Sequence, residues 1–134
     1  MRIEIVQFAP AFPGRQENWR RIQAWAERSP ADIVLFPELS SCGYMYESPK
    51  EIGPYVDGPS ALHPLERLSA RTGKLIVGGF AELADGERYN SAYAVGPDGT
   101  SIYRKIHLWN REKLIFEEGD QPCLIEYQGR KVGI

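Results

Sequence analysis

Cysteine is scarce in this sequence of 134 residues, because Cys42 and Cys123 are its only two. They lie far apart and form none of the short spacings that metal-binding cysteines have. In a chain without a secretory signal, two such thiols are expected to stay reduced rather than join in a disulfide. The sequence therefore predicts neither a metal site nor a bound cofactor.

A strong excess of charge of one sign is also missing. The chain has 16 lysine and arginine residues against 18 acidic residues, which gives a formal net charge of −2. Nucleic acids and anionic membranes attract basic stripes, so neither is an expected partner. No apolar run approaches the length that a bilayer requires, and Met1 leads directly into a charged strand pattern instead of a signal peptide. These features predict a cytoplasmic protein.

What the sequence does contain is the pattern of a folded α/β domain. Hydrophobic residues make up 43% and charged residues 25%, and the length suits one structural unit. Residues 3–8 and 32–36 read as strands, and the first is expected to be buried on most sides. Between them, residues 16–28 have the spacing of an amphipathic helix, with Trp19 and Trp25 expected in the core. Strand, helix and strand in this order predict a parallel βαβ unit.

The remainder of the chain predicts that the sheet is mixed. Residues 39–59 lack a regular period and are expected to form one wall of a crevice. A second helix is expected over residues 60–72, followed by a strand at 74–82 whose Gly78-Gly79 pair indicates a bulge or a close backbone approach. Turn sequences then predict antiparallel strands at 89–95, 101–104, 123–127 and 131–134. No linker or repeat is evident.

The first residue with a chemical signal is Glu38. The apolar run at 33–36 predicts a buried strand, and Pro37 ends it because proline has no N–H group for the sheet ladder. An acid at the exit of a strand can reach a crevice beyond the strand ends while the scaffold fixes its backbone. A solvated loop acid is the alternative that this stretch alone leaves open.

Lys105 and Glu112 form a second candidate pair. Lys105 ends another strand-like segment, and Glu112 follows seven positions later. If the strand ends converge, the carboxylates of Glu38 and Glu112 surround one ammonium group and keep it charged. A fixed cation in a dry crevice stabilises a developing oxyanion, and a carboxylate beside a thiol can act as its base. A surface ion pair beside a hairpin is the plain alternative for Lys105 and Glu112.

Taken together, these stretches resemble the carbon–nitrogen hydrolase (nitrilase) family. The matching pieces are LFPELSSCGY from residue 35, YRKIHL from residue 103 and EKLIFEEGD from residue 112. The resemblance runs from Met1 to Ile134 and covers only the first part of the family's domain. It implies an α/β fold that is the N-terminal portion of an αββα sandwich, with a mixed sheet and helices on one face. Residues 1–134 would then be a single carbon–nitrogen hydrolase domain that is incomplete at its C-terminal end.

The resemblance also implies a reaction. Hydrolysis of an amide, a carbamoyl amine or a nitrile would proceed through a cysteine thiolate. Glu38 would act as the base, Lys105 would stabilise the tetrahedral intermediate, and Glu112 would position the lysine and the substrate. Tyr44 and Trp109 could line the substrate pocket. A small-molecule substrate and a homodimer or higher oligomer of the complete domain are the implied partners.

The nucleophile is expected a few residues beyond Ile134. Neither Cys42, in the irregular segment, nor Cys123, after a proline at the start of a strand, lies at a tight strand-to-helix turn that would expose it. The 134-residue chain alone is therefore expected to be inactive. His107 shares the side of Lys105 on an extended backbone, and we expect it to brace the loop through a hydrogen bond.

Two other functions stay open. The chain could be a non-catalytic remnant or an assembly subunit of the same fold, which the presence or absence of a cysteine directly after Ile134 in the gene would decide. Alternatively, Glu38 and Glu112 could be the acid pair of a glycosidase. The lysine between them argues against a glycosidase, and release of ammonia rather than of a reducing sugar would exclude it.

Overall fold

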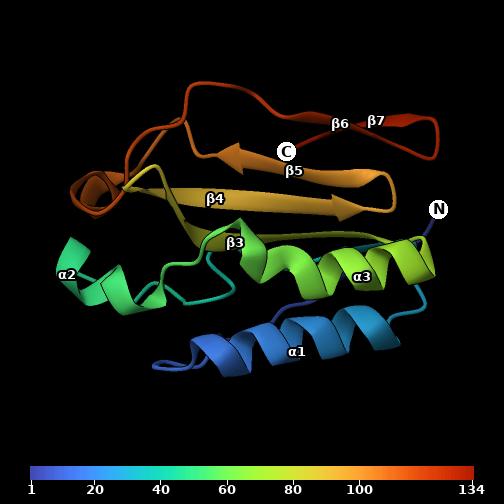
Figure 1. The fold of residues 1–134 in the computed structure, drawn as a ribbon, viewed down its shortest axis with the longest axis horizontal. Coiled ribbons are helices and arrows are strands. Elements are labelled where there is room, and N and C mark those ends of the chain that lie inside the picture. The colour runs from blue at the N-terminus through green and yellow to red at the C-terminus, as the bar shows by residue number, and fades with distance from the viewer.

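The computed structural model describes residues 1–134 and shows a layered arrangement of helices and strands (Figure 1). In chain order the strands are β1 (Ile3–Ile5), β2 (Ile33–Leu35), β3 (Leu75–Ala84), β4 (Glu87–Gly96), β5 (Gly99–Arg104), β6 (Leu124–Tyr127) and β7 (Arg130–Gly133). The α-helices are α1 (Arg15–Arg28), α2 (Pro49–Ile52) and α3 (His63–Thr72), and the short 3₁₀ helices η1, η2 and η3 span Gly53–Tyr55, Pro59–Leu62 and Asn110–Leu114. None of these helices combines the length and the apolar character that a bilayer crossing requires.

Strands β1 to β5 form one sheet in sequence order. The pairs β1–β2 and β2–β3 are parallel, whereas β3–β4 and β4–β5 are antiparallel. The β3–β4 turn is Asp85-Gly86, where both residues have positive φ angles, 54° and 86°. Positive φ at both central residues is the geometry of the hairpin turn that matches the twist of the strands. The mixed sheet predicted from the sequence is therefore confirmed.

Helices α1 and α3 cover one face of this sheet (Figure 1). Ile22 and Ala26 of α1 and Leu65 of α3 are buried there against Val34 and Ile76 of the parallel strands. The three- and four-residue spacing on each helix places these side chains on a single stripe that faces the sheet. The expectation of helices on one face is confirmed.

The two tryptophans of α1 lie in different environments. Trp19 packs against Phe80 and Tyr93 at the core, as predicted. Trp25 is 38% exposed and lies under the guanidinium group of Arg28. The prediction that both tryptophans are buried is therefore wrong for Trp25, because it lies at the edge of the apolar stripe, where the sheet no longer covers it.

The hairpin of β6 and β7 packs against the opposite face of the sheet. Tyr127 of β6 is buried with Ile33 of β2 and Leu75 of β3. Its hydroxyl oxygen lies 3.0 Å from the Asp32 carbonyl oxygen and 2.8 Å from the Gly73 carbonyl oxygen, and its single O–H group donates to this pair of acceptors. The hairpin is thus fixed to the sheet by one aromatic side chain that is both buried and hydrogen-bonded.

The same face is uncovered at the β1 edge. Ile3 and Ile5 are 59% and 73% exposed, and β1 ends at Ile5 rather than continuing to residue 8. The prediction that this strand is buried on most sides is therefore wrong. The apolar residues that the hairpin covers belong to β2, β3 and β4, and the first buried residue is Val6, which follows β1 and joins the core cluster under the helices.

The segment predicted to be irregular, residues 39–59, contains the short helices α2 and η1, whereas the helix predicted over residues 60–72 is formed by η2 and α3. The apolar side chains of the irregular segment join a second buried cluster, made of Leu39, Cys42, Tyr46, Ile52, Ala81, Leu108, Ile115 and Phe116. This second cluster packs the segment that follows β2 against the segment that follows β5. Those two segments carry the candidate site residues, so the packing holds the two halves of the site together.

Candidate functional site

Glu38 lies where the chain leaves β2 and continues along β3. The Phe36 N–H donates to the Val77 carbonyl at 2.8 Å, and the Gly79 N–H donates to the Pro37 carbonyl at 3.0 Å. Gly79 has no room for a side chain, since a Cβ there would lie 2.7 Å from the Glu38 Cα. The close backbone approach predicted for the glycine pair is therefore confirmed, and it determines where Glu38 lies.

Lys105 follows directly after β5, and its backbone is fixed from two sides. Its N–H donates to the Asn90 carbonyl at 2.9 Å, and its carbonyl accepts from the Gly119 N–H at 3.0 Å. The preceding residue, Arg104, donates two hydrogen bonds of 2.9 Å to the buried carboxylate of Glu82. Lys105 therefore leaves the sheet from a strand end whose position is well determined.

Glu112 is carried by η3, within the loop that starts at Lys105 and returns to it at Gly119. Glu112 Oε2 accepts a hydrogen bond from the Trp109 N–H at 2.7 Å and so caps the start of η3. Gly119 packs on the Arg104 carbonyl with no space for a Cβ. The closed base of the loop directs Glu112 back toward Lys105.

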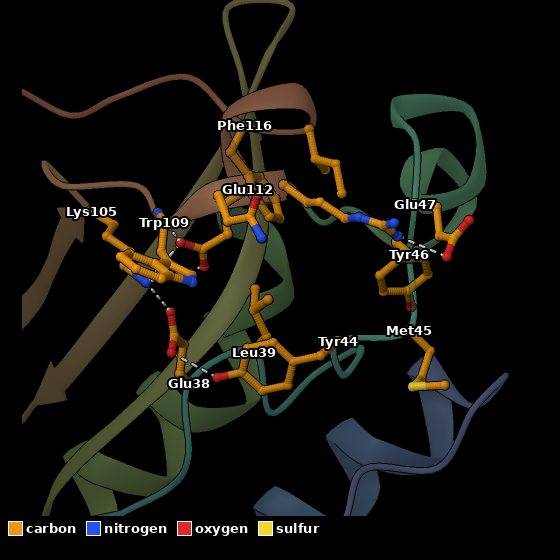
Figure 2. Close-up of a pocket in the computed structure, with 13 residues that line it drawn as sticks. Glu38, Leu39, Tyr44, Met45, Tyr46, Glu47, Lys105, Trp109, Glu112 and Phe116 are labelled. Carbon is orange, nitrogen blue, oxygen red and sulfur yellow. Dashed lines mark hydrogen bonds and ion pairs between the residues drawn. The ribbon is translucent and has the colours of Figure 1, made fainter.

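The structure brings the three predicted residues into one cluster. Lys105 Nζ lies 2.8 Å from Glu38 Oε1 and 3.0 Å from Glu112 Oε2 (Figure 2). β3 runs parallel to β2, and two antiparallel pairings then give β5 the direction of β2. The ends of β2 and β5 therefore lie at the same edge of the sheet, and the expected convergence of strand ends is confirmed.

The contacts of Glu38 and Lys105 shift the pKa of each group in the direction that favours its charged form. Burial alone would raise the pKa of Glu38, but hydrogen bonds from Lys105, a tyrosine hydroxyl and an asparagine amide hold it below its ordinary value. Burial alone would lower the pKa of Lys105, but hydrogen bonds to Glu38 and Glu112 hold it above its ordinary value. At neutral pH, Lys105 is an ammonium group and Glu38 is a carboxylate.

The two carboxylates differ in how many of their lone pairs are already used. Glu112 accepts from Lys105 at both oxygens, from the Asn90 amide and from a backbone N–H, and its side chain is only 18% exposed. Glu38 Oε1 also has two donors, whereas its Oε2 accepts only from the Tyr44 hydroxyl at 2.7 Å. A general base needs a lone pair within reach of the proton that it takes. Of the four oxygens, Oε2 of Glu38 best meets this need.

A cleft of about 610 Å³ opens beside the cluster (Figure 2). Its volume falls within the range of small-molecule sites. Glu38, Lys105 and Glu112 line it together with Tyr44 and Trp109, the two residues predicted to face a substrate. Trp109 is 79% exposed, whereas Tyr44 donates its hydroxyl to Glu38. A contact of either aromatic residue with substrate stays a prediction.

A second cavity, of about 370 Å³, is lined by the same ion pair. Glu38 and Lys105 share it with Val77, Tyr103 and Ile134. Val77 belongs to the sheet face that the β6–β7 hairpin covers, so this cavity lies on the face opposite α1 and α3. The ion pair can therefore be approached from two directions.

Asn90 of β4 is the site residue that the sequence analysis missed. Its side-chain amide donates to Glu38 Oε1 at 2.7 Å and to Glu112 Oε1 at 2.9 Å. Asparagine is depleted in strands. The presence of an asparagine inside the predicted strand at 89–95 was therefore the feature of the sequence that could have pointed to Asn90 as a site residue.

The other polar candidates lie outside the cluster. Cys42 is 1% exposed, and burial raises the pKa of its thiol to about 11, which makes it a poor nucleophile. Cys123 is half-buried, and neither cysteine is in a disulfide. His107 is exposed and its ring has no hydrogen-bond partner in the loop, so the bracing role predicted for it is wrong. No group of three or more His, Cys, Asp or Glu residues is arranged to hold a metal ion.

Comparison with known proteins identifies relatives over the whole chain. The family model described as "Carbon-nitrogen hydrolase" matches residues 2–134. A nitrilase from Pyrococcus abyssi is 34% identical over 128 residues, which cover 90% of this chain and 48% of the nitrilase. An (R)-stereoselective amidase from a Pseudomonas species is 30% identical over 138 residues, which cover 100% of this chain and 50% of the amidase.

A solved structure has the same fold. An amidase from a Nesterenkonia species superposes with a TM-score of 0.82 at 25% identity, covering 99% of this chain and 54% of the amidase. The likeness confirms the fold expected for the N-terminal portion of a nitrilase-like αββα sandwich. The chain spans about half the length of the curated relatives that it matches. Because the family model matches residues 2–134, the chain belongs to the carbon–nitrogen hydrolase family.

Proposed function

We propose that this protein hydrolyses non-peptide carbon–nitrogen bonds of an amide, a carbamoyl amine or a nitrile, using Glu38, Lys105 and a cysteine that lies beyond Ile134. Family membership supports the bond class. The observation that carries the proposal is the Lys105 ammonium group held between two carboxylates at a cleft. A mutant of the Nesterenkonia amidase shows the result of Michael addition of acrylamide at its active site cysteine, which supports a thiol route here.

The reaction on an amide uses the unequal surroundings of the two acids. Glu38 takes the thiol proton as sulfur bonds to the carbonyl carbon, and Lys105 stabilises the negative oxygen that forms. Glu38 then gives its proton to the leaving nitrogen as the C–N bond breaks, so that ammonia or an amine departs and a thioester remains. Glu38 next removes a proton from water as the water oxygen attacks the thioester. The C–S bond breaks, the sulfur regains a proton from Glu38, and the carboxylic acid is released.

The two cavities support separate approaches for substrate and thiol. In this proposal the larger cleft, lined by Tyr44 and Trp109, receives the substrate. The smaller cavity contains Ile134 beside Glu38 and Lys105. A cysteine shortly after Ile134 can therefore reach the cluster from the opposite face of the sheet. Residues 1–134 would be the first part of one hydrolase domain, and the complete protein would form a homodimer or higher oligomer in the cytoplasm.

The test measures ammonia or amine release from panels of amides, carbamoyl amines and nitriles, using the protein expressed from its complete gene. Lys105→Ala should lower kcat about a hundredfold to a thousandfold, the usual effect of removing one oxyanion donor. Alkylation of the reactive thiol should abolish turnover. Lys113→Ala is the matched control, because Lys113 is an exposed lysine whose partner is Glu118, outside the cluster.

Each outcome separates the candidate functions. Near-normal turnover by Lys105→Ala would show that the lysine is structural. Release of a reducing sugar in place of ammonia would support the glycosidase assignment. A gene without a cysteine after Ile134, together with no turnover on any of these substrates, would favour a non-catalytic remnant or assembly subunit.

A further inference from the structure

Asn90 contacts all three predicted site residues from within β4. The residue is buried, with 3% of its surface exposed. Its Nδ2 group donates to Glu38 Oε1 at 2.7 Å and to Glu112 Oε1 at 2.9 Å. Its backbone carbonyl accepts from the Lys105 N–H at 2.9 Å. One residue of the sheet thus links the two carboxylates to each other and to the backbone that carries the ammonium group.

The orientation of the Asn90 amide follows from its surroundings. An amide nitrogen has two N–H groups and accepts no hydrogen bond, so both hydrogens serve the two carboxylates. Turning the amide over would place its oxygen against two negatively charged oxygens. Lys105 Nζ donates to the same two atoms, Oε1 of Glu38 at 2.8 Å and Oε1 of Glu112 at 3.1 Å. Each Oε1 therefore already accepts two hydrogen bonds.

We propose that Asn90 is a positioning residue that keeps Oε1 of Glu38 occupied, so that Oε2 is the oxygen that exchanges protons with thiol, leaving nitrogen and water. Oε2 has one donor, the hydroxyl of Tyr44, which lines the substrate cleft (Figure 2). Without the Asn90 amide, Oε1 would have a free lone pair and the carboxylate would lose one of its restraints. The proton could then bind on the wrong oxygen, facing Glu112. This inference rests on the proposed hydrolase function.

A purely structural role is the competing explanation, because a buried amide is hydrogen-bonded in nearly every protein. The two roles differ in what happens to Glu38 when the amide is removed. A structural role predicts lower stability with an unchanged Glu38 titration. The positioning role predicts that the pKa of Glu38 rises, because a donor to its charged form is lost.

The experiment follows the Glu38 carboxyl group by ¹³C NMR across pH in the protein expressed from its complete gene. The Glu38 midpoint should move to higher pH in Asn90→Ala and further in Asn90→Asp, which keeps the shape but adds a third negative charge. Ser91→Ala is the matched control, because it removes a buried polar group of β4 that binds Glu82. In that control the Glu38 midpoint should stay in place.

Kinetics give a second readout of the same variants. In Asn90→Ala, kcat/KM at neutral pH should fall about tenfold to a hundredfold. This is the loss in rate expected when one hydrogen bond to a charged group is removed from the transition state. The acid limb of the kcat/KM pH profile should move to higher pH, as the Glu38 midpoint measured by NMR does. Ser91→Ala should leave that limb in place even if it lowers Tm.

An unchanged Glu38 midpoint in Asn90→Asp would overturn the proposal. If neither variant folds, the wild-type protein decides, because the Asn90 side-chain amide resonances should shift through the Glu38 midpoint. Amide resonances that do not respond to that titration would also overturn it. The titration requires no turnover, so a wild-type protein without hydrolase activity would refute the proposed function, while the NMR result would still decide the role of Asn90.

Discussion

Replacing Gly79 with alanine should displace Glu38 while leaving every group of the proposed reaction chemically intact. The Gly79 carbonyl accepts the Ser40 hydroxyl at 2.9 Å, so β3 and the segment after Glu38 are in direct contact. A Cβ at position 79 would lie 2.7 Å from the Glu38 Cα and 2.8 Å from the Glu38 carbonyl carbon. Both are backbone atoms, which cannot rotate aside as the end of a side chain can.

The size of the displacement follows from these distances. An ordinary Cβ contact begins at 3.4 Å, so the Glu38 backbone has to retreat by about 0.6 to 0.7 Å, and the backbone nitrogen of Leu39, which would lie closer still, by more. The 2.8 Å bond between Glu38 and Lys105 would stretch or reorient. A misplacement of about 1 Å can lower a rate about a hundredfold. Overpacking of this kind costs about 1–3 kcal/mol of folding free energy, so we expect a folded protein whose kcat/KM is about a hundredfold lower.

The assay combines ammonia release with thermal unfolding, again on the protein expressed from its complete gene. Gly58→Ala is the matched control, because an added Cβ there has no atom within 4 Å and the φ angle is −75°. This control should keep both turnover and Tm. Wild-type turnover in a folded Gly79→Ala protein would refute the argument that the position of Glu38 governs the reaction.

The buried thiol, the tyrosine beside the base and the pH range of the ion pair provide further tests. Cys42→Ser should keep near-normal ammonia release, because this thiol is buried and its pKa is raised to about 11; complete loss of activity in a folded variant would identify Cys42 as the nucleophile. Tyr44→Phe should move the acid limb of kcat/KM to higher pH, because Glu38 Oε2 loses its donor; an unmoved limb would contradict that role. Folding stability, measured by urea denaturation, should fall at both ends of the pH range. Glu38 has a folded pKa below its ordinary 4.5, so its contribution is present above 4.5 and is lost as pH falls through the lowered pKa. Lys105 has a folded pKa above its ordinary 10.5, so its contribution is present below 10.5 and is lost as pH rises through the raised pKa. If a Lys105→Met variant lost stability at low and high pH as the wild-type protein does, the pH dependence could not be assigned to the Glu38–Lys105 pair.

The sequence alone was sufficient for the order and type of most elements, because the signals for them are local. A change of period from two to 3.6 separates strand from helix along the βαβ unit. A turn such as Asp85-Gly86 requires positive φ angles, which these residue types adopt readily. The spacing of the motifs also placed Glu38, Lys105 and Glu112 at strand exits. Their convergence could then be predicted, since strands that run the same way end at the same edge of the sheet.

What covers each face was decided only by the tertiary structure. The period of a helix or strand shows which side chains share a face, but it does not show how far the neighbouring layer extends. Trp25 and Ile5 are apolar residues on faces that looked buried, yet each lies where the covering layer ends.

The finer chemistry of the site was also decided by tertiary structure. Asn90 reaches the two carboxylates because β3 and β4 pair with Asn90 opposite Ala81. A shift of one residue in that register would turn its side chain to the other face of the sheet. The different surroundings of Oε1 and Oε2 of Glu38 likewise depend on donors from three segments, the loop at Tyr44 and the distant residues Asn90 and Lys105. Hydrogen bonds depend on tenths of an ångström, and only the packed chain sets distances that finely.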